Sequence, residues 1–358
     1  MSANSRNIKI VMTGGGTAGH VVPHLALLPG MKKRSWETFY IGSAGIEKTM
    51  IEKTDVPFYT ISAGKLRRYF SLQNFLDVFK VMFGCVQSLM FLMKIRPNLV
   101  FSKGGFVSVP VAVAAWALRI PVVTHESDLT PGLANKIVKR FCKKILFTFP
   151  ETSKYLPKDI GVYVGSPVRE EIFTGQKSDG YKVTGFSSED SRPVVLVMGG
   201  SLGAKKLNDL IASDIADLTK EFRFVHLTGK GKKVIENRDG YVSFEFLSEE
   251  LKDVYAMTDL IVARSGANSI FEFLALNKPM MLVPLEAGSR GDQLQNATSF
   301  VESGFATLKR EGELKEGDLL QALKELHSNS SEMKNAQSNF SSASAIEKVL
   351  EQIEEVVN

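Results

Sequence analysis

A histidine closes a glycine-rich turn near the start of the chain. The apolar run Ile8–Met12 leads into the letters TGGGTAG, and His20 follows at once. A strand that enters a helix through such a turn gathers backbone N–H groups and the positive helix end at one point, where an anion or polar oxygen can bind. We expect His20 in the first helical turn, where the dipole disfavours imidazolium, so it is a candidate general base. A histidine that only packs at a helix start is the alternative.

Two further turns of this kind lie in the second half of the chain. The turn Gly199–Ala204 follows an apolar strand, and its N–H groups with the Ser201 hydroxyl suit a diphosphate. The turn Arg264–Ser269 begins a helix that carries Glu272 among apolar neighbours. A carboxylate there needs a partner, either a ribose diol or an internal lysine. Each turn could also be only a tight connection between a strand and a helix.

Three further polar residues, Asp292, Gln293 and Arg169, are candidates for substrate contacts. Asp292 and Gln293 lie in a loop after the apolar run Met280–Val283, a usual place for groups that read a sugar's hydroxyls. Arg169, in the letters GSPVR, could pair with phosphate or could be an ordinary surface residue.

Short apolar strands alternate with longer helical stretches, which predicts an α/β fold of parallel sheets with crossover helices. Both halves repeat the plan of strand, glycine turn and helix. We therefore expect two domains, 1–166 and 167–344, with a last helix, 345–358, packing back on the first. The Ser- and Asn-rich stretch 328–344 is expected to be a linker. The expected strands are Ile8–Met12, Thr38–Ile41, Leu99–Ser102, Val122–Thr124, Ile145–Thr148, Val194–Met198, Phe224–Leu227, Ser243–Phe246, Leu260–Ala263 and Met280–Val283.

Length and composition limit the classes of protein. At 358 residues and 44% hydrophobic content, the chain can bury two cores. Cys85 and Cys142 show no CxxC or Cys/His ligand spacing, so we expect no disulfide and no zinc site. The apolar run after the polar N-terminus is too short for a signal sequence or a spanning helix, and a reducing cytoplasm fits best.

Seven motifs, in order over residues 8 to 305, resemble those of the MurG family: GGGTAGHVVPHLAL, SKGGFVSVP, HESDLTPGLANK, GSPVR, GGSLGA, ARSGANSIFE and GDQLQNA. Members of that family are N-acetylglucosaminyltransferases of peptidoglycan synthesis. The resemblance implies a GT-B architecture, two Rossmann-like domains with parallel sheets facing across a cleft. It also implies inverting transfer of GlcNAc from UDP-GlcNAc to the C4 hydroxyl of MurNAc in undecaprenyl-pyrophosphoryl-MurNAc-pentapeptide, the step from lipid I to lipid II.

The resemblance also implies site residues by motif position. The candidate catalytic base is His20, with Glu126 and Asp128 as rivals. Asp128 stands where many members have asparagine, and a carboxylate cannot donate an amide's hydrogen bonds. Asp292 likewise stands where other members often have glutamine. The expected UDP-GlcNAc contacts are Thr17, Ala18, Gly19, Arg169, Ser201, Leu247 (uracil, through its backbone), Ala267, Asn268, Ser269, Glu272, Asp292 and Gln293.

No DxD motif, the usual metal-holding pattern of glycosyltransferases, occurs in the sequence. We expect no metal site and no cofactor. The helix N-termini after Gly203 and Gly266, with Arg169, could instead compensate the charge of the leaving diphosphate.

The segment between Tyr69 and Met93 is rich in Phe, Leu and Met, but Asp77, Lys80 and Gln87 interrupt it, so a spanning helix is not expected. Basic and aromatic residues just before it suit anionic headgroups. We expect a peripheral dock on the cytoplasmic face of the cell membrane; a buried crossover helix with charged ends is the alternative. The dock residues would be Arg67, Arg68, Phe75, Phe79 and Phe83.

The expected partners are UDP-GlcNAc, a lipid-linked muramoyl-peptide acceptor, an anionic membrane surface and other cell-wall synthesis proteins, but not nucleic acid. A UDP-GlcNAc 2-epimerase or hydrolase of the same fold is an alternative, although it would not need the apolar segment near residue 80. A non-catalytic nucleotide-sugar sensor is another, although it would not need His20 together with the stretch His125–Asn135.

Overall fold

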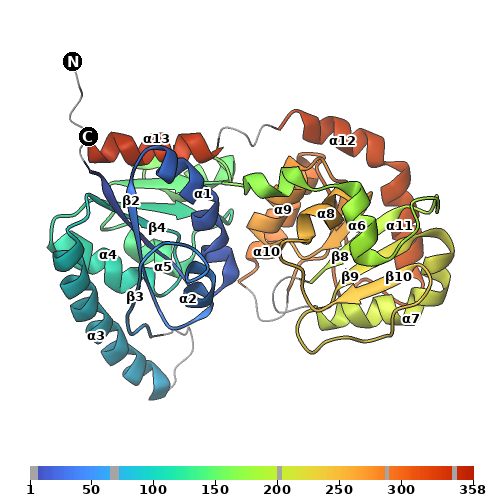
Figure 1. The fold of residues 1–358 in the computed structure, drawn as a ribbon, viewed down its shortest axis with the longest axis horizontal. Coiled ribbons are helices and arrows are strands. Elements are labelled where there is room, and N and C mark those ends of the chain that lie inside the picture. The colour runs from blue at the N-terminus through green and yellow to red at the C-terminus, as the bar shows by residue number, and fades with distance from the viewer. Residues whose placement is uncertain (1–6, 65–71, 200–203, 287–289, 341–344) are drawn as a thin grey trace. The chain divides into compact units, whose positions relative to one another are not determined.

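The computed structural model describes residues 7–64, 72–199, 204–286, 290–340 and 345–358. The chain forms two compact units, shown in Figure 1. Unit 1 is Met1–Arg169 with Ser342–Asn358, and unit 2 is Glu170–Ser341. Each unit has its own parallel sheet covered by helices, and each is described by itself.

The sheet of unit 1 has the strand order β3-β2-β1-β4-β5-β6-β7, and all its strands are parallel. The chain moves outward from β1 to β3 and then continues from β4 in the other direction. Neighbours β1 and β4 are therefore the topological switch point, whose carboxyl ends usually hold the ligand in such sheets. The strands are β1 Lys9–Thr13, β2 Glu37–Gly42, β3 Phe58–Thr60, β4 Leu99–Ser102, β5 Val122–Glu126, β6 Lys144–Phe147 and β7 Gly161–Tyr163.

Helices cover both faces of this sheet, which explains why its central strands carry apolar residues on both sides. The C-terminal helix α13 (Ala345–Val357) packs on α1 (Val22–Lys33) and buries Leu350. Gly30 of α1 permits this, because a Cβ there would collide with the Leu350 Cδ1 atom. An ion pair of 2.6 Å between Arg34 and Glu347 adds to the contact. The other helices of unit 1 are η1 Ala18–His20, α2 Ile46–Ile51, α3 Leu72–Ile95, α4 Ser108–Ala117, α5 Leu133–Val138 and η2 Pro150–Tyr155.

The sheet of unit 2 has the parallel order β10-β9-β8-β11-β12-β13, with its switch point between β8 and β11. Its strands are β8 Val194–Met198, β9 Arg223–Leu227, β10 Tyr241–Phe244, β11 Leu260–Ala263, β12 Met280–Leu282 and β13 Thr307–Leu308. Its helices are η3 Glu170–Thr174, α6 Lys177–Thr184, α7 Lys205–Glu221, α8 Leu251–Met257, α9 Ala267–Ala275, α10 Asp292–Glu302, α11 Asp318–Ser328 and α12 Ser330–Ser338.

Every strand expected from the sequence forms, with shifts of one or two residues at some ends. The prediction of a polar linker over 328–344 is wrong, because most of it forms α12, which buries Met333 in the core of unit 2. Three short strands, β3, β7 and β13, were not expected. Each lies at a sheet edge and has only two or three residues, so its hydrophobic run is too short to stand out.

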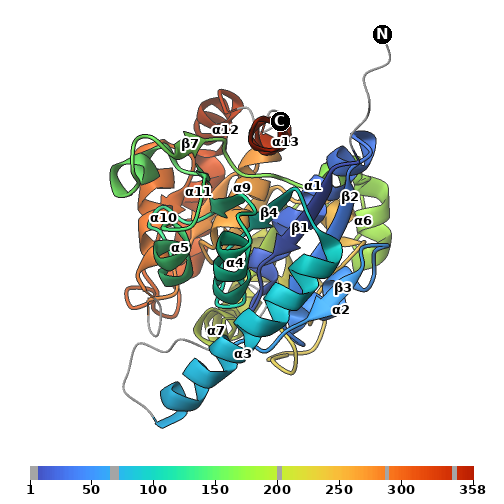
Figure 2. The ribbon, with the colours of Figure 1, turned by 90° about the vertical axis from the view of Figure 1, so that its left-hand side faces the viewer.

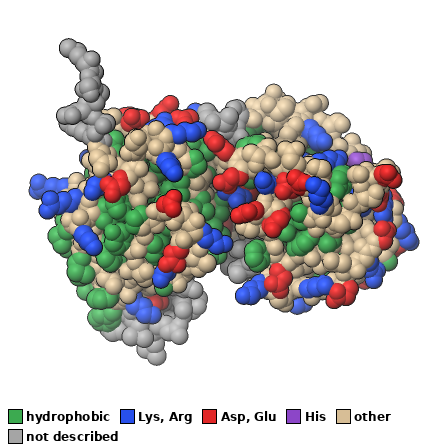
Figure 3. Space-filling view, in the orientation of Figure 1, with side chains coloured by type: hydrophobic (Ala, Val, Ile, Leu, Met, Phe, Trp, Pro, Cys, Tyr) green, Lys and Arg blue, Asp and Glu red, His purple; other side chains and the backbone are tan. Residues whose placement is uncertain are grey.

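The long helix α3 turns polar groups toward unit 1 and an apolar face outward. The Gln87 side chain accepts a hydrogen bond of 2.7 Å from the Ser62 N–H, and Asp77 is buried. Gly84 contacts the Ser62 backbone so closely that a Cβ there would collide with the Ser62 carbonyl oxygen. Figure 2 shows α3 along the outer side of unit 1, and Figure 3 shows apolar side chains gathered there. The outward side chains, each at least 49% exposed, are Val78, Phe79, Met82, Phe83, Val86, Met90 and Met93.

Candidate active site

His20 lies just after the glycine turn at the carboxyl end of β1. It is the last residue of the 3-10 turn η1, and α1 begins two residues later at Val22. The prediction that His20 lies in the first turn of the α-helix is therefore wrong. His20 lies two residues before the helix, in the 3-10 segment Ala18–His20. The Thr17 hydroxyl lies 3.0 Å from the His20 Nδ1 atom. A hydroxyl that accepts from Nδ1–H would leave the ring's lone pair on Nε2, the arrangement a general base needs.

A buried carboxylate, Glu47 of α2, holds this turn from behind. One of its oxygens accepts from the Gly16 N–H at 3.1 Å, and the other accepts from the Ser43 N–H at 3.0 Å and from the Ser43 hydroxyl. The space is so tight that a Cβ on Gly15 would collide with the Glu47 carboxyl group. Glu47 was not among the residues predicted from the sequence, since nothing in the segment GIEKTM distinguishes it from a surface glutamate. Its place just after β2, the neighbour of β1, is the one available signal.

A second glycine turn, after β4, meets the first one. Gly104 and Gly105 have φ values of +81° and +78°, which favour glycine. A Cβ on Gly105 would collide with the Gly15 carbonyl oxygen, so the two backbones are in direct contact. Beneath them His24 is fully buried next to Tyr40, whose hydroxyl donates to the Gly14 carbonyl at 2.8 Å. Burial lowers the pKa of His24 well below its usual value, so it is a neutral structural residue.

Glu126, at the end of β5, uses both carboxylate oxygens to shape the loop that follows. One oxygen accepts from the Asp128 N–H at 3.1 Å. The other accepts from the Gly132 N–H at 2.9 Å and from the Asn135 side-chain amide at 2.8 Å. The Asn135 amide oxygen in turn accepts from the Thr124 hydroxyl at 3.0 Å. Glu126 thus organises the segment that carries Asp128.

Lys103, just after β4, and His125 of β5 form a buried pair beside this loop. The Lys103 ammonium donates to the Ser127 hydroxyl at 2.7 Å and contacts the His125 Nδ1 atom. His125 Nε2 lies 3.1 Å from the Gly165 carbonyl oxygen, which can only accept. Nε2 therefore carries the ring proton, and Nδ1 offers its lone pair to Lys103. Lys103 lies in the motif SKGGFVSVP, but no function was predicted for it from the sequence.

In unit 2 the predicted donor residues follow the carboxyl ends of β11 and β12. Ala267 is the first residue of α9, with Asn268 and Ser269 in the same turn, and Asp292 is the first residue of α10. The Ser265 hydroxyl donates to the Gln293 carbonyl at 2.8 Å, which ties the starts of the two helices together. Two helix N-termini therefore point their N–H groups to one sheet edge, which suits a diphosphate.

Glu272 of α9 is buried, and its carboxylate accepts a hydrogen bond of 3.2 Å from the Tyr255 hydroxyl. The sequence predicts a ribose diol or an internal lysine as its partner, and Tyr255 was not expected. The Gln293 side-chain oxygen accepts from the Leu285 N–H at 2.9 Å, and Asp292 accepts from the Arg290 N–H at 3.2 Å. Both side chains thus brace the loop after β12.

Of the remaining predicted residues, the structure describes Leu247 and Arg169. Leu247 is half-buried in the loop after β10, and Arg169 is the last residue of the first segment of unit 1. Ser201, Arg67 and Arg68 lie outside the described residues. Phe75 belongs to α3, but its side chain is outside the described part.

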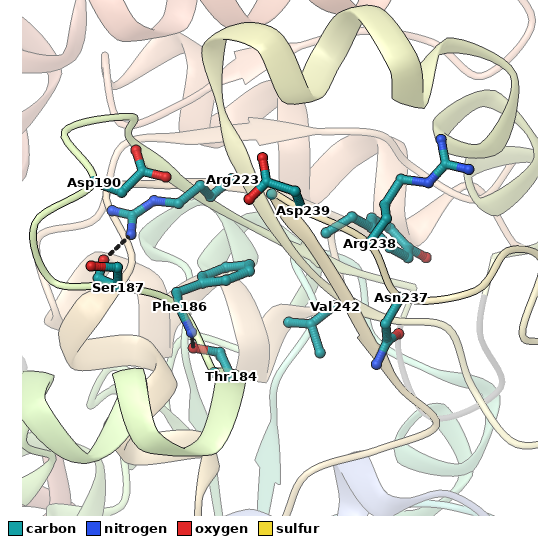
Figure 4. Close-up of a pocket in the computed structure, with 12 residues that line it drawn as sticks. Thr184, Phe186, Ser187, Asp190, Arg223, Asn237, Arg238, Asp239 and Val242 are labelled. Atoms are coloured by element: carbon teal, nitrogen blue, oxygen red, sulfur yellow. Dashed lines mark hydrogen bonds between the residues drawn. The ribbon is translucent and has the colours of Figure 1, made fainter.

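Unit 2 also contains a hollow of about 320 Å³, drawn in Figure 4. Arg223 and Tyr241 line it, and they are the first residues of β9 and β10. The hollow therefore lies at the amino edge of the sheet, opposite the edge with the donor candidates. Arg223 is already engaged there, since it stacks on Tyr181 and Phe186 at 5.6 Å and donates to the Ser187 carbonyl at 2.7 Å. We assign the hollow no part in the site.

Comparison with known proteins identifies the family. Residues 10–147 match the N-terminal domain of glycosyltransferase family 28, and residues 194–353 match its C-terminal domain. A Bacillus cereus protein named UDP-N-acetylglucosamine–N-acetylmuramyl-(pentapeptide) pyrophosphoryl-undecaprenol N-acetylglucosamine transferase 2 is 48% identical over 97% of this chain and 99% of its own. A Clostridium tetani protein named as the same transferase is 47% identical over 97% of both chains. The chain belongs to the MurG family.

Solved structures agree on the fold of this MurG-family chain. MurG of Acinetobacter baumannii superposes with a TM-score of 0.75 at 22% identity, covering 97% of this chain and 99% of the other. A UDP-GlcNAc 2-epimerase from Neisseria meningitidis gives a TM-score of 0.66 at 13% identity, covering 97% and 99%. The expected GT-B class, with two Rossmann-like domains, is confirmed. Because the epimerase shares the fold, the close sequence relatives decide between the two enzyme classes.

Replacing Glu47 by glutamine should weaken both the glycine turn and catalysis. The amide keeps one acceptor oxygen, but its NH2 group would face the Gly16 or Ser43 N–H. An unsatisfied buried donor costs about 1–3 kcal/mol. A displaced turn should lower kcat by about tenfold or more.

Urea unfolding and kcat would measure the two effects. The control is Glu52→Gln, an exposed residue just past the end of the same helix, which should change neither. A destabilised Glu47→Gln variant with an unchanged kcat would contradict the link between this brace and the chemistry.

Proposed function

We propose that this chain transfers GlcNAc from UDP-GlcNAc to the C4 hydroxyl of MurNAc in undecaprenyl-pyrophosphoryl-MurNAc-pentapeptide, a step of peptidoglycan synthesis. The observation that carries the proposal is 48% identity, over nearly the whole chain, to a relative named for this transfer. The groups at the carboxyl edges of both sheets support it, since they include the two kinds that the reaction needs: a base for the acceptor hydroxyl and N–H donors for the leaving diphosphate.

Unit 2 binds the donor in this proposal. The N–H groups at the starts of α9 and α10 take the diphosphate, and Glu272 takes the ribose hydroxyls, with Tyr255 holding its carboxylate in place. Leu247 takes the uracil through its backbone, and Ser201, Asn268, Ser269, Asp292, Gln293 and Arg169 complete the donor contacts. As the bond from the sugar to the diphosphate breaks, negative charge grows on UDP, and helix N-termini stabilise charge at that position without reorganising.

Unit 1 supplies the base. His20 takes the proton of the C4 hydroxyl as its oxygen attacks the anomeric carbon from the side opposite UDP, which inverts the configuration. Thr17 orients the ring through Nδ1, while Ala18 and Gly19 offer backbone N–H groups to the donor. Glu126 is a weaker candidate because three donors already occupy its carboxylate. Asp128, in the loop that Glu126 shapes, positions the acceptor.

His20→Ala should remove the base and leave the fold intact. The assay uses radiolabelled UDP-GlcNAc and the lipid-linked muramoyl-peptide acceptor. Loss of a general base lowers kcat by about 10²- to 10⁴-fold, with little change in the KM for UDP-GlcNAc.

His327→Ala, an exposed histidine on α11, is the matched control and should retain full activity. Full activity of His20→Ala alongside an inactive, folded Glu126→Ala would transfer the assignment to the carboxylate. Absence of labelled lipid from the native protein would refute the proposed function itself.

Turnover should persist in EDTA, because helix N-termini rather than a bound divalent ion compensate the leaving diphosphate. In the described part of the chain, no three His, Cys, Asp or Glu side chains are grouped so as to hold a metal. Rates would be measured with excess EDTA and, as a control for ionic strength, with the same EDTA saturated by Mg²⁺. A rate abolished by EDTA and restored only by Mg²⁺ or Mn²⁺ would overturn this expectation.

Because the acceptor is anchored in lipid, the protein must bind at the membrane surface. The helix α3 is suited to bind there. Its outward apolar face is rimmed by charge, with Lys80 and Lys94 both exposed. The helix is long and apolar enough to span a bilayer by composition. Its polar side, however, bonds to the segment around Ser62, so spanning would break those contacts. We infer that α3 lies flat in the cytoplasmic face of the membrane, bound to apolar tails and anionic headgroups. Protein partners from cell-wall synthesis stay a prediction.

A double variant, Phe79→Ser with Phe83→Ser, should weaken membrane binding. Each ring is about half exposed, so transfer of both to lipid contributes on the order of 2 kcal/mol, or about thirtyfold in the partition coefficient. Flotation with vesicles of phosphatidylglycerol and phosphatidylcholine would measure this.

The matched control is Phe173→Ser with Phe246→Ser, two exposed phenylalanines of unit 2. Equal flotation of the two double variants, both folded, would reject α3 as the dock.

A further inference from the structure

Lys103 is a buried cation that the proposed mechanism leaves without a function. It follows β4, is 2% exposed, and lies between His125 and Ser127. His125 is itself fixed, because its other ring nitrogen donates to the Gly165 carbonyl. The ammonium is therefore held in one place by two neutral acceptors on the strand and loop that lead to Asp128.

Stability alone does not explain this residue. Removing an ammonium group from water is costly, and apolar side chains of similar volume are often equally or more stable at such positions. Burial lowers the pKa of Lys103 to about 7, although the negative charges of Glu126 and Asp128 act in the opposite direction. Near neutral pH a part of Lys103 therefore keeps its positive charge, because the two carboxylates offset some of the desolvation penalty, and those carboxylates are what the charge can stabilise.

The charged and titratable groups around Lys103 come from two elements. Glu126 and Asp128, at and after the end of β5, favour its protonated form, and His125 on β5 touches it. His24, on α1, is also coupled to it, since the Lys103 charge helps to keep the pKa of His24 low. Of these groups, Glu126 is already satisfied by three N–H donors, whereas Asp128 lies in the loop that we assign to the acceptor.

We propose that Lys103 is a positioning residue for the transfer reaction, and that its ammonium holds Ser127 and balances the Asp128 carboxylate so that the 125–128 segment presents Asp128 to the acceptor sugar. This inference rests on the proposed function. A carboxylate in a half-buried loop is stabilised by a nearby cation, and the charges of Lys103 and Asp128 act on each other.

Protonation of Lys103 gives the proposal a pH signature. The charged form is the active one, so kcat/KM for the lipid acceptor should fall as pH rises above about 7. Stability should change in the opposite direction. The unfolded chain keeps the lysine proton up to its ordinary pKa, so between pH 7 and about 10 it binds more protons than the folded chain, and the folded state gains stability as pH rises.

The test is a double-mutant cycle of Lys103→Met and Asp128→Asn in the full chain, assayed with UDP-GlcNAc and the lipid-linked acceptor. Lys103→Met alone should lower kcat/KM for the acceptor at least tenfold, leave the KM for UDP-GlcNAc unchanged and abolish the fall above pH 7. In the Asp128→Asn background the same change should cost threefold or less. The thermal midpoint of Lys103→Met at pH 7 should be equal to or higher than that of the native chain.

Lys136→Met, an exposed lysine on α5, is the control and should behave like the native chain. A Lys103→Met variant with native acceptor kinetics would overturn the proposal, as would equal losses in the native and Asp128→Asn backgrounds. Failure of the proposed function is distinguishable, because the native chain would then form no labelled lipid at all. If Lys103→Met does not fold, Lys103→Gln, which keeps hydrogen bonding without the charge, takes its place under the same criteria.

Discussion

The contact between two backbone turns, at Gly15 after β1 and Gly105 after β4, is the constraint on which the site of unit 1 depends. A Cβ on Gly105 would collide with the Gly15 carbonyl oxygen, so the two strand ends can approach this closely only with a glycine at position 105, while Gly15 itself is packed against the Glu47 carboxyl group. This approach places His20, Lys103 and the loop after β5 at adjacent ends of β1, β4 and β5. The switch point of the sheet thus brings the candidate site residues together, because no side chain separates the two turns.

Two buried carboxylates then fix the backbone conformation of the loops beside these glycines. Glu47 accepts N–H donors from the turn before His20, and Glu126 accepts them from the loop that carries Asp128. A carboxylate in this use is an acceptor for backbone groups that would otherwise be unsatisfied, which is why both can remain buried. A carboxylate bound in this way is poorly suited to take a proton from substrate, and this favours the histidine as base.

The fold was largely predictable because a central parallel strand must be apolar on both faces, and its run of letters is unmistakable. Edge strands such as β13 need not be apolar on both faces, so the sequence did not predict them. The glycine turn before His20 was predictable because its run of glycines follows an apolar strand, whereas the buried positions of Glu47 and Tyr255 were not. Their significance depends on the contacts that folding gives them, and a glutamate in IEKTM has no local feature that marks it as buried.

Which face of α3 points outward likewise depends on contacts that only the folded chain provides. Its polar residues fall on one stripe, which in a helix of a soluble domain would normally face water. Gln87 instead bonds to the Ser62 backbone, and Gly84 gives the close approach that makes this bond possible. The inner side of α3 thus combines this hydrogen bond with the buried residues Leu92 and Ile95, and the exposed apolar residues of the helix face outward. In the proposed function this orientation is useful, since the same contacts that attach the helix to unit 1 leave its apolar side available as the membrane dock.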